Sequence, residues 1–282
     1  MNKNKSIIIG TALTFLLAFS PIESFSANQT DETIPITAPI SGIYFTGQYK
    51  PGISNFSNFS AKETNYNTQK LVRLKKDAKE SNLLGTTTNF EDTYSVKFQN
   101  NIISFSGIIG YATSKGIRLE IEGAYESFDV KSPVGYSKDN AYYRYFALAR
   151  SMTKENPKEF TVMKNNGLSV ASIMINGCYD FALDDFALSP YICAGIGEDF
   201  IEFFDALHIK IAYQGKLGIS YRVSPKISLF IDGYYHHIIG NQFKNLSVHH
   251  AVELSEFPKN SSAVATLDIG YLGGEVGARF IF

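Results

Sequence analysis

Residues 207–222 read LHIKIAYQGKLGISYR, and apolar side chains occupy alternate positions along most of this stretch. One face carries Ile209, Ile211, Tyr213, Leu217, Ile219 and Tyr221. The opposite face carries Lys210, Gln214, Lys216, Ser220 and Arg222. Because successive side chains of a β-strand point to opposite faces, the stretch predicts a long strand with one apolar and one polar face.

The same alternation continues in both directions along the chain. Residues 226–237 (KISLFIDGYYHH) and 116–128 (GIRLEIEGAYESF) repeat it. Less regular segments with strand composition lie at 41–49, 100–111, 167–179, 188–197 and 263–282. These segments predict eight strands, an even number as in bacterial outer-membrane barrels. Twelve strands remain open, because residues 50–100 and 131–166 are each long enough to hold another hairpin.

The ends of these strands favour a membrane barrel over a secreted soluble one. Aromatic residues gather there, as in the interfacial girdles of membrane barrels; they are Tyr125, Tyr221, Tyr235, Phe280 and Phe282. The connections also alternate in length. Short ones lie at 112–115, 180–187 and 223–225, and longer ones at 50–99, 131–166, 198–206 and 238–262. We therefore expect an all-β protein: an antiparallel transmembrane β-barrel with long external loops that contain short helical pieces.

The first 26 residues predict a signal peptide. Lys3 and Lys5 precede the apolar run SIIIGTALTFLLAF, and small residues follow Pro21. This order is typical of a secretory leader, with cleavage after either Ser26 or Ala27. We expect residues 1–26 to be the leader, residues 27–282 to be the barrel, and the bacterial outer membrane at the cell surface to be its location.

The chain ends on the aromatic stretch GEVGARFIF, residues 274–282. Alternation places Phe280 and Phe282 outward, and Glu275 and Gly277 inward. This pattern resembles the C-terminal signal that the barrel-assembly machinery reads. Outer-membrane lipid and that machinery are therefore the first expected partners.

The inward polar residues are candidates for lining the lumen; they are Arg118, Glu120, Glu122, Lys210, Lys216, Arg222, Asp232, Glu275 and Arg279. In an open barrel their charges would set ion selectivity. In a closed barrel they would form a salt-bridge network, and function would belong to the external loops. An eight-stranded barrel is about filled by its own side chains, whereas twelve strands would leave a channel.

Catalytic, cofactor-binding and metal-binding motifs are not found in the sequence. No HExxH or CxxC spacing occurs among the histidines and cysteines, so we expect neither an enzyme nor a cofactor. A net charge of −1 gives no indication of nucleic acid as a partner.

Cys178 and Cys193 lie nearly equidistant from the centre of the 180–187 turn, so a hairpin would bring them opposite each other. Both a structural disulfide and two free thiols are open at this point.

Three loop segments carry more specific expectations. The basic run KLVRLKKDAKE, 70–80, predicts a solvated loop or short amphipathic helix, with binding of lipopolysaccharide, heparin-like glycans or host surfaces as the alternative. Residues 141–152 have helical composition. Residues 198–208 predict a short helix or lid on the barrel mouth, with strand continuing above the membrane as the alternative.

Several long stretches resemble the immunodominant major outer-membrane proteins of Ehrlichia and Anaplasma. They are GIYFTGQYKPGISNFSNFS (42–60), YFALAR (145–150), NGLSVASIMINGCYDF (166–181), SPYICAGIGEDFIEFFDALHIKIAYQGKLGISY (189–221) and KISLFIDGYYHHIIGNQFKNL (226–246). The resemblance implies a surface-exposed antigen with variable external loops and porin activity for small hydrophilic solutes. It implies host surface molecules and antibodies as partners, leaves a homo-oligomer open, and brings no catalytic residues.

Overall fold

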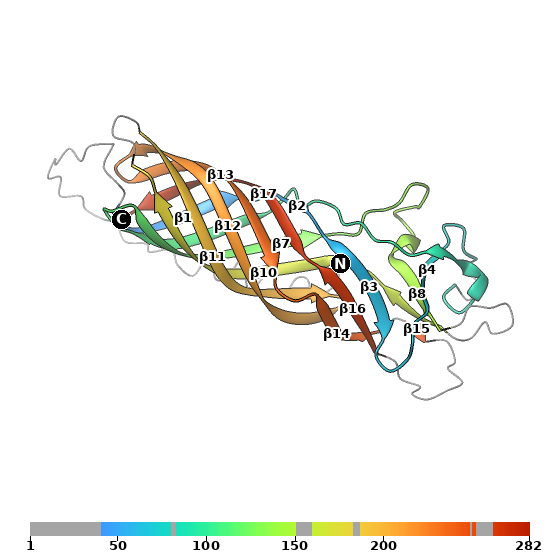
Figure 1. Cartoon of the computed structure of the whole chain (residues 1–282). Helices are drawn as coiled ribbons and strands as arrows, with labels where there is room; N and C mark the ends of the chain where they lie inside the picture. Colours follow the sequence, from blue (N-terminus) through green and yellow to red (C-terminus); the bar gives the residue numbers. More distant parts are fainter. Residues whose placement is uncertain (1–40, 80–82, 151–159, 183–186, 249, 252–261) are drawn as a thin grey trace, which may run out of the picture.

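The computed structural model describes residues 41–79, 83–150, 160–182, 187–248, 250–251 and 262–282, so the expected signal peptide lies outside the described residues. Its largest sheet is a barrel of antiparallel strands (Figure 1). The barrel strands are β1 (Gly42–Tyr49), β6 (Phe105–Ala112), β7 (Ile117–Phe128), β10 (Leu168–Asp180), β11 (Leu188–Phe203), β12 (Ala206–Ser224), β13 (Ile227–Ile238) and β17 (Gly270–Ile281). The prediction of an eight-stranded barrel is confirmed.

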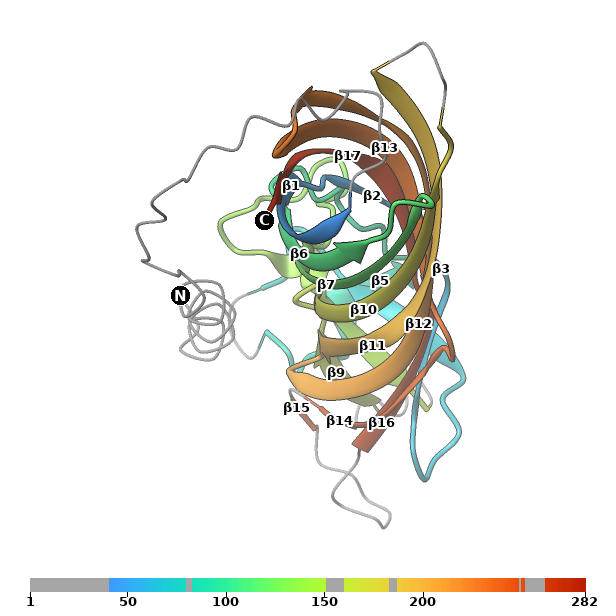
Figure 2. The ribbon, with the colours of Figure 1, turned by 90° about the vertical axis from the view of Figure 1, so that its left-hand side faces the viewer.

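Pairing between the first and last strands closes the barrel. Thr46 lies opposite Arg279 in the β1–β17 pair, while the other edge of β1 pairs with β6. The short β2 (Gly52–Ser54) continues the pairing with β17 beyond Pro51. The view along the barrel shows the strands curving around a common axis (Figure 2). Closure leaves no free edge among these eight strands, as a membrane-spanning sheet requires.

The outer face of the barrel is apolar and carries aromatic residues near both ends. Between them lie exposed aliphatic side chains such as Ile121, Ile175 and Leu217. At the end with the short turns, here called the turn end, the exposed aromatics are Tyr111, Tyr179, Phe181, Tyr221, Phe280 and Phe282. Toward the other end they are Tyr49, Phe105, Tyr213 and Tyr235. An apolar band between two aromatic girdles is the surface that a lipid bilayer covers.

The strands extend well past the membrane band at the end opposite the short turns. There β14 (Gln242–Ser247), β16 (Ser262–Asp268) and β3 (Ser57–Glu63) form one sheet. A second sheet contains β15 (His250–Ala251), β9 (Phe160–Lys164), β8 (Tyr145–Ala149), β4 (Lys70–Leu74) and β5 (Phe90–Thr93). We call these two sheets and their connections the head, and the adjoining end of the barrel the head end (Figure 1).

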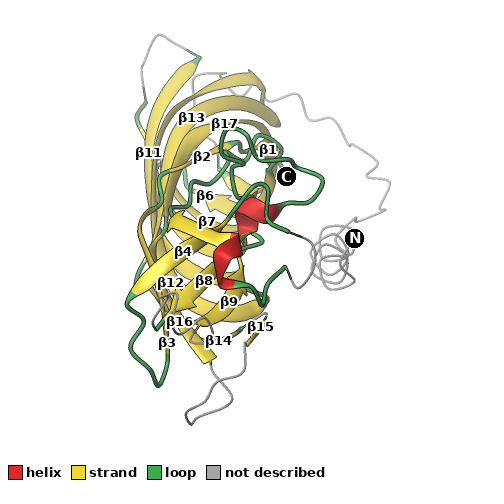
Figure 3. Ribbon diagram, turned by 90° about the vertical axis from the view of Figure 1, so that its right-hand side faces the viewer, coloured by secondary structure: helices red, strands yellow, loops and turns green. Residues whose placement is uncertain are grey.

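The head corrects two loop predictions. The run 70–80 begins as strand β4, because Val72 and Leu74 alternate into the core of the head while Lys70 stays exposed. Of the stretch 141–152, residues 141–150 are described, and they contain one 3-10 turn, η2 (Tyr142–Arg144), followed by strand β8, whose residues Phe146–Ala149 are all buried. Helical composition was overridden by burial on both faces of a sheet. The second 3-10 turn, η1 (Thr87–Asn89), precedes β5. Figure 3 draws the helical turns in red beside the strands of the head.

Residues 198–208 were predicted as a helix or lid, and that prediction is wrong. Strand β11 runs to Phe203 and β12 starts at Ala206, so two residues make the turn. Phe204 and Asp205 have φ of 51° and 58°, the left-handed backbone that two-residue hairpin turns use. The stated alternative, strand continuing above the membrane, is what the structure has.

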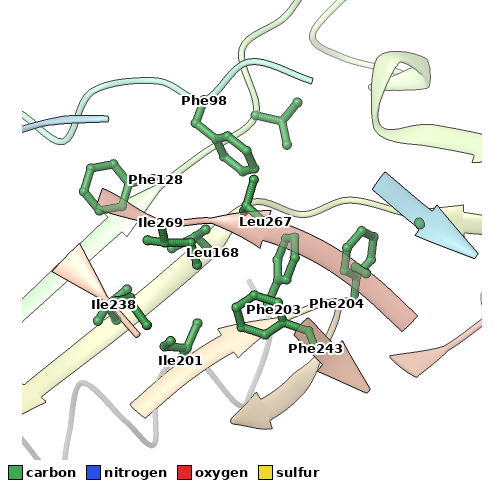
Figure 4. Close-up of a cluster of buried hydrophobic side chains, with 14 of the residues drawn as sticks. Phe98, Phe128, Leu168, Ile201, Phe203, Phe204, Ile238, Phe243, Leu267 and Ile269 are labelled. Atoms are coloured by element: carbon green, nitrogen blue, oxygen red, sulfur yellow. The ribbon is translucent and has the colours of Figure 1, made fainter. Parts of the chain in front are cut away.

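A hydrophobic core joins the head to the barrel mouth. Phe128, Leu168, Ile201 and Ile238 come from the head ends of barrel strands and pack with Phe243 of the head (Figure 4). The ring of Phe203 lies 4.4 Å from that of Phe204 and 5.1 Å from that of Phe243, measured between centroids. The barrel interior therefore changes from polar to apolar at its mouth.

Within the described residues, no helix is long and apolar enough to cross a membrane.

Polar bonds also fix the three-stranded sheet of the head. Asn58 and Asn241 donate hydrogen bonds to the Asp268 carboxylate at 2.5 and 2.8 Å. These two bonds lower the pKa of Asp268, because they favour its charged form. The head is thus an ordered β-structure in its described part.

Candidate functional site in the barrel interior

The candidate site is the polar lumen, built by every second residue of the barrel strands. On β7 the inward residues are Arg118, Glu120, Glu122 and Glu126, all buried, while their neighbours on the apolar face point outward. The same parity places Lys216 of β12 and Glu275 of β17 inside. Strand alternation alone thus brings opposite charges from distant parts of the chain to one interior.

Four charged groups meet near the middle and form what we call the central ring: Lys50, Glu122, Lys216 and Glu275. Lys50 Nζ lies 2.6 Å from Glu122 Oε1 and 3.0 Å from Glu275 Oε1. Lys216 Nζ lies 2.8 Å from Glu122 Oε2 and 2.8 Å from Glu275 Oε2. Each cation contacts both carboxylates, and each carboxylate contacts both cations. Two positive and two negative charges therefore balance within the ring.

Amide side chains complete the coordination of Glu122. Gln48 and Gln214 donate to its carboxylate at 3.2 and 2.8 Å, and Asn176 donates at 3.1 Å. Gln214 also donates to the Asn176 oxygen at 2.6 Å. A buried carboxylate with this many partners keeps its charge and a fixed position.

The head end of the lumen contains a cluster of polar side chains around a single histidine, His236. His236 Nε2 lies 2.7 Å from Asp199 Oδ2, and the imidazole stacks on the Tyr271 ring at 4.6 Å between centroids. The Tyr271 hydroxyl donates to Glu126 at 3.2 Å. These aromatic rings fill the space between the central ring and the apolar core at the mouth.

The turn end of the lumen is filled by arginines stacked on rings. Arg118 pairs with Asp180 and, at 3.2 Å, with Glu120, which also accepts a hydrogen bond from Tyr44 at 2.6 Å. Tyr191 lies between two guanidinium groups, 4.9 Å from Arg118 and 4.8 Å from Arg279. Its hydroxyl donates to Asp232.

Most of the sequence-predicted lumen residues lie in this interior, and two are peripheral. Arg222 lies near the turn end, with no carboxylate within 4 Å among the described residues. Lys210 is half-buried beyond the lumen, where its ammonium donates to the Gln242 carbonyl at 3.0 Å above the Phe243 ring. Lys210 has inward parity, but its position along β12 places it beside the head.

The residues predicted to line the lumen did not include three further charged side chains, nor its amide, histidine and tyrosine side chains. The omitted residues are Tyr44, Gln48, Lys50, Glu126, Asn176, Tyr191, Asp199, Gln214, His236 and Tyr271. Period-two parity could have found most of them, since Gln48 and Lys50 continue the inward set of β1. Tyr191 is harder to find, because aromatic residues in a barrel are first assigned to the lipid face.

The two cysteines lie opposite each other in the β10–β11 pair and form a disulfide. Glu120 Oε and the two sulfurs lie within 4.8 Å of one another. Because the sulfurs are bonded to each other, no thiolate is free to bind a metal there.

In the predicted assembly signal, Glu275 belongs to the central ring, Gly277 faces inward, and Phe280 and Phe282 are exposed.

The charged side chains of the lumen are buried from solvent along its length. Arg118, Glu120, Glu122, Lys216, Glu275 and Arg279 expose between 0% and 4% of their surface. In a water-filled channel, the lining side chains would be exposed to water. What the arrangement can do is hold charge in balance and fill the lumen.

Comparison with known proteins identifies one family and several similar proteins. The profile of a family described as "Surface antigen" matches residues 37–282. Major surface antigen 4 of Anaplasma marginale is 32% identical over 247 residues, which cover 86% of this chain and 85% of that protein. The outer membrane protein OprG from Pseudomonas aeruginosa has a similar fold, with a TM-score of 0.52 and 13% identity over 88% of this chain and 99% of that one. Neisserial surface protein A aligns with a TM-score of 0.39 and 14% identity over 86% and 98% of the two chains.

Proposed function

The chain belongs to the surface antigen family, and from this premise we propose that its barrel is a closed membrane anchor whose head makes the protein's contacts outside the cell. The chain is an outer-membrane, cell-surface protein. Short turns of such barrels face the periplasm and longer loops face the exterior, so the head is the part exposed to the surroundings. This proposal gives the chain no catalytic role.

The central ring is the observation that carries the proposal. Its four charged side chains lie across the lumen with ion-pair distances of 2.6 to 3.0 Å. An ion in transit would have to separate these pairs and leave a charge buried without a partner, which costs several kcal/mol. Eight strands also leave an interior that side chains fill.

The second candidate is porin activity for small hydrophilic solutes, which the family resemblance implies. The polar and charged character of the interior favours it, since a lumen lined by Lys, Arg and Glu would select ions by charge. The burial of those same residues weighs against it. Porin activity stays a prediction, and conductance separates the two candidates.

The test is conductance of refolded protein in a planar bilayer, with a boiled sample as control. Heat-shifted gel mobility must first show that the protein is folded. We expect no stable current steps from the folded protein. Stable, salt-dependent steps that the boiled sample lacks would overturn the closed-anchor proposal and support an open lumen.

A further inference from the structure

We propose that one side of the head is a binding surface for an anionic glycan, recognised through lysines that three segments bring together. The inference rests on the proposed role of the head as the contact surface. The three segments are the run after β4, the residues before β6 and the loop after β7. We call Lys76, Lys97 and Lys131 the lysine patch; all three are exposed.

Two of these lysines face each other directly across a pair of extended segments. Phe98 and Val130 form an antiparallel bridge and are buried, at 9% and 2% exposure. Lys131 N donates to the Lys97 carbonyl at 2.7 Å, so these two residues are the next pair along the ladder. Alternation then turns both side chains away from the core, with Cα atoms about 5.5 Å apart or closer.

Like charges directly opposite each other destabilise a strand pair unless an anion lies between them. The nearest carboxylate on the ladder, Asp129, is already used: Arg144 contacts it at 2.8 Å, and the Val130 amide donates to it at 2.7 Å. Neither Lys97 nor Lys131 has a carboxylate within 4 Å among the described residues. The pair is therefore available to an external anion.

The third lysine comes from the basic run. Lys76 lies against Gly135, where a Cβ added to the glycine would be 3.8 Å from Lys76 Nζ. The loop after β7 is folded back, since the Tyr136 amide donates to the Pro133 carbonyl at 3.3 Å. Tyr136 also donates to the Leu74 carbonyl at 2.9 Å, which holds this loop against β4. By contrast, the neighbouring Lys75 is paired with Glu91 at 2.8 Å.

These features select the class of partner. The cations are exposed and spread over several segments, which suits an extended polymer with repeated negative charges better than one small anion. The net charge of the chain is −1, so attraction would be local to the patch. Polysaccharides bearing sulfate or carboxylate groups have this chemistry and are present on cell exteriors.

The test measures binding of heparin, with neutral dextran as the control polymer, to the full chain in detergent micelles. The variant K97S/K131S removes two charges from the patch. The matched control K62S/K244S removes two exposed lysines from the other sheet of the head, on β3 and β14. We expect the patch variant to bind heparin about five- to thirtyfold more weakly, and the control less than about twofold.

Heat-shifted mobility shows whether both variants fold, and removing opposed like charges should not lower the stability of the patch variant. Equal weakening of heparin binding in both variants would overturn the proposal, because the overall electrostatic field of the protein, and not the lysine patch, would then account for binding. Absence of heparin binding by the unmodified protein, or binding of anionic lipid vesicles in its place, would overturn it as well. The planar-bilayer result is independent: a conducting barrel would refute the closed anchor and leave the binding data to stand alone.

Discussion

Lys216 shows how strongly a single residue in this lumen depends on its partners. Its ammonium bridges Glu122 and Glu275 and is buried. Its outward neighbour Leu217 is among the most exposed aliphatic residues of the barrel wall. Side chains at adjacent positions of one strand therefore lie in opposite environments: the lumen, where charges are paired, and the lipid.

Lys216→Met should lower the free energy of unfolding by about 3–5 kcal/mol, because two buried carboxylates would share one remaining cation, Lys50. Urea titration in detergent, followed by circular dichroism, measures the change. Lys226→Met is the matched control, since Lys226 is exposed in the β12–β13 turn and its loss should cost about 0.5 kcal/mol or less. Similar stability of the two variants would show that the ring does not hold the lumen together.

Gly277→Ala tests the close approach of β17 to its neighbours. A Cβ at this position would lie 2.6 Å from the Gly47 carbonyl oxygen and 2.7 Å from a ring carbon of Phe230. Overpacking of this kind costs about 1–3 kcal/mol, so the folded fraction in heat-shifted mobility assays should fall. Gly274→Ala on the same strand is the control, because its nearest neighbour would be 3.5 Å away. If both variants fold equally well, close packing does not explain the glycine.

At the scale of elements, the β10–β11 hairpin combines a covalent link with a long register. Cys178 and Cys193 are 15 residues apart in sequence and directly opposite in the sheet. The pairing then continues to Leu168 and Phe203, beside the head. The hairpin therefore connects the turn end of the lumen to the core at the mouth.

The variant C178S/C193S should be about 3 kcal/mol less stable, because an intact link over 15 residues restricts the unfolded chain. Its circular dichroism spectrum should be unchanged, since the strand register is held by backbone pairing. Reductant should lower the stability of the unmodified protein by a similar amount and leave the variant unaffected. A reductant effect on the variant would point to another cause.

Elements with one lipid-facing side were predictable from sequence, and elements of the head were not. In 207–222 every outward position must be apolar, so the period of two is plain. Strand β8 is buried on both faces, so YFALA shows no alternation and was assigned helical composition. The turn at Phe204–Asp205 lacks the Asn-Gly or Asp-Gly signal of such hairpins, because Phe204 is needed in the core of the head.

At the scale of the whole molecule, the barrel interior has two parts that differ in composition. Charged and amide groups fill the membrane-spanning part, and aromatic and aliphatic groups fill the mouth under the head. Sequence parity indicated the charged part, including Glu122 and Lys216. The apolar core could not be predicted, because it depends on how Phe128, Phe203 and Phe243 meet across elements that are far apart in sequence.

The orientation of the whole chain gives a final prediction, made with single cysteines in two exposed positions. Val134 lies in the loop after β7 on the head side, at 103% exposure, and Lys226 lies in the β12–β13 turn at the other end. The native cysteines do not interfere, because both are held in the disulfide. Short turns face the periplasm in such barrels. A membrane-impermeant maleimide should therefore label V134C on intact cells, and label K226C only after the outer membrane is permeabilised. Labelling of K226C on intact cells, with V134C protected, would mean that the head faces the periplasm, and both the closed-anchor proposal and the glycan surface would then lose their basis.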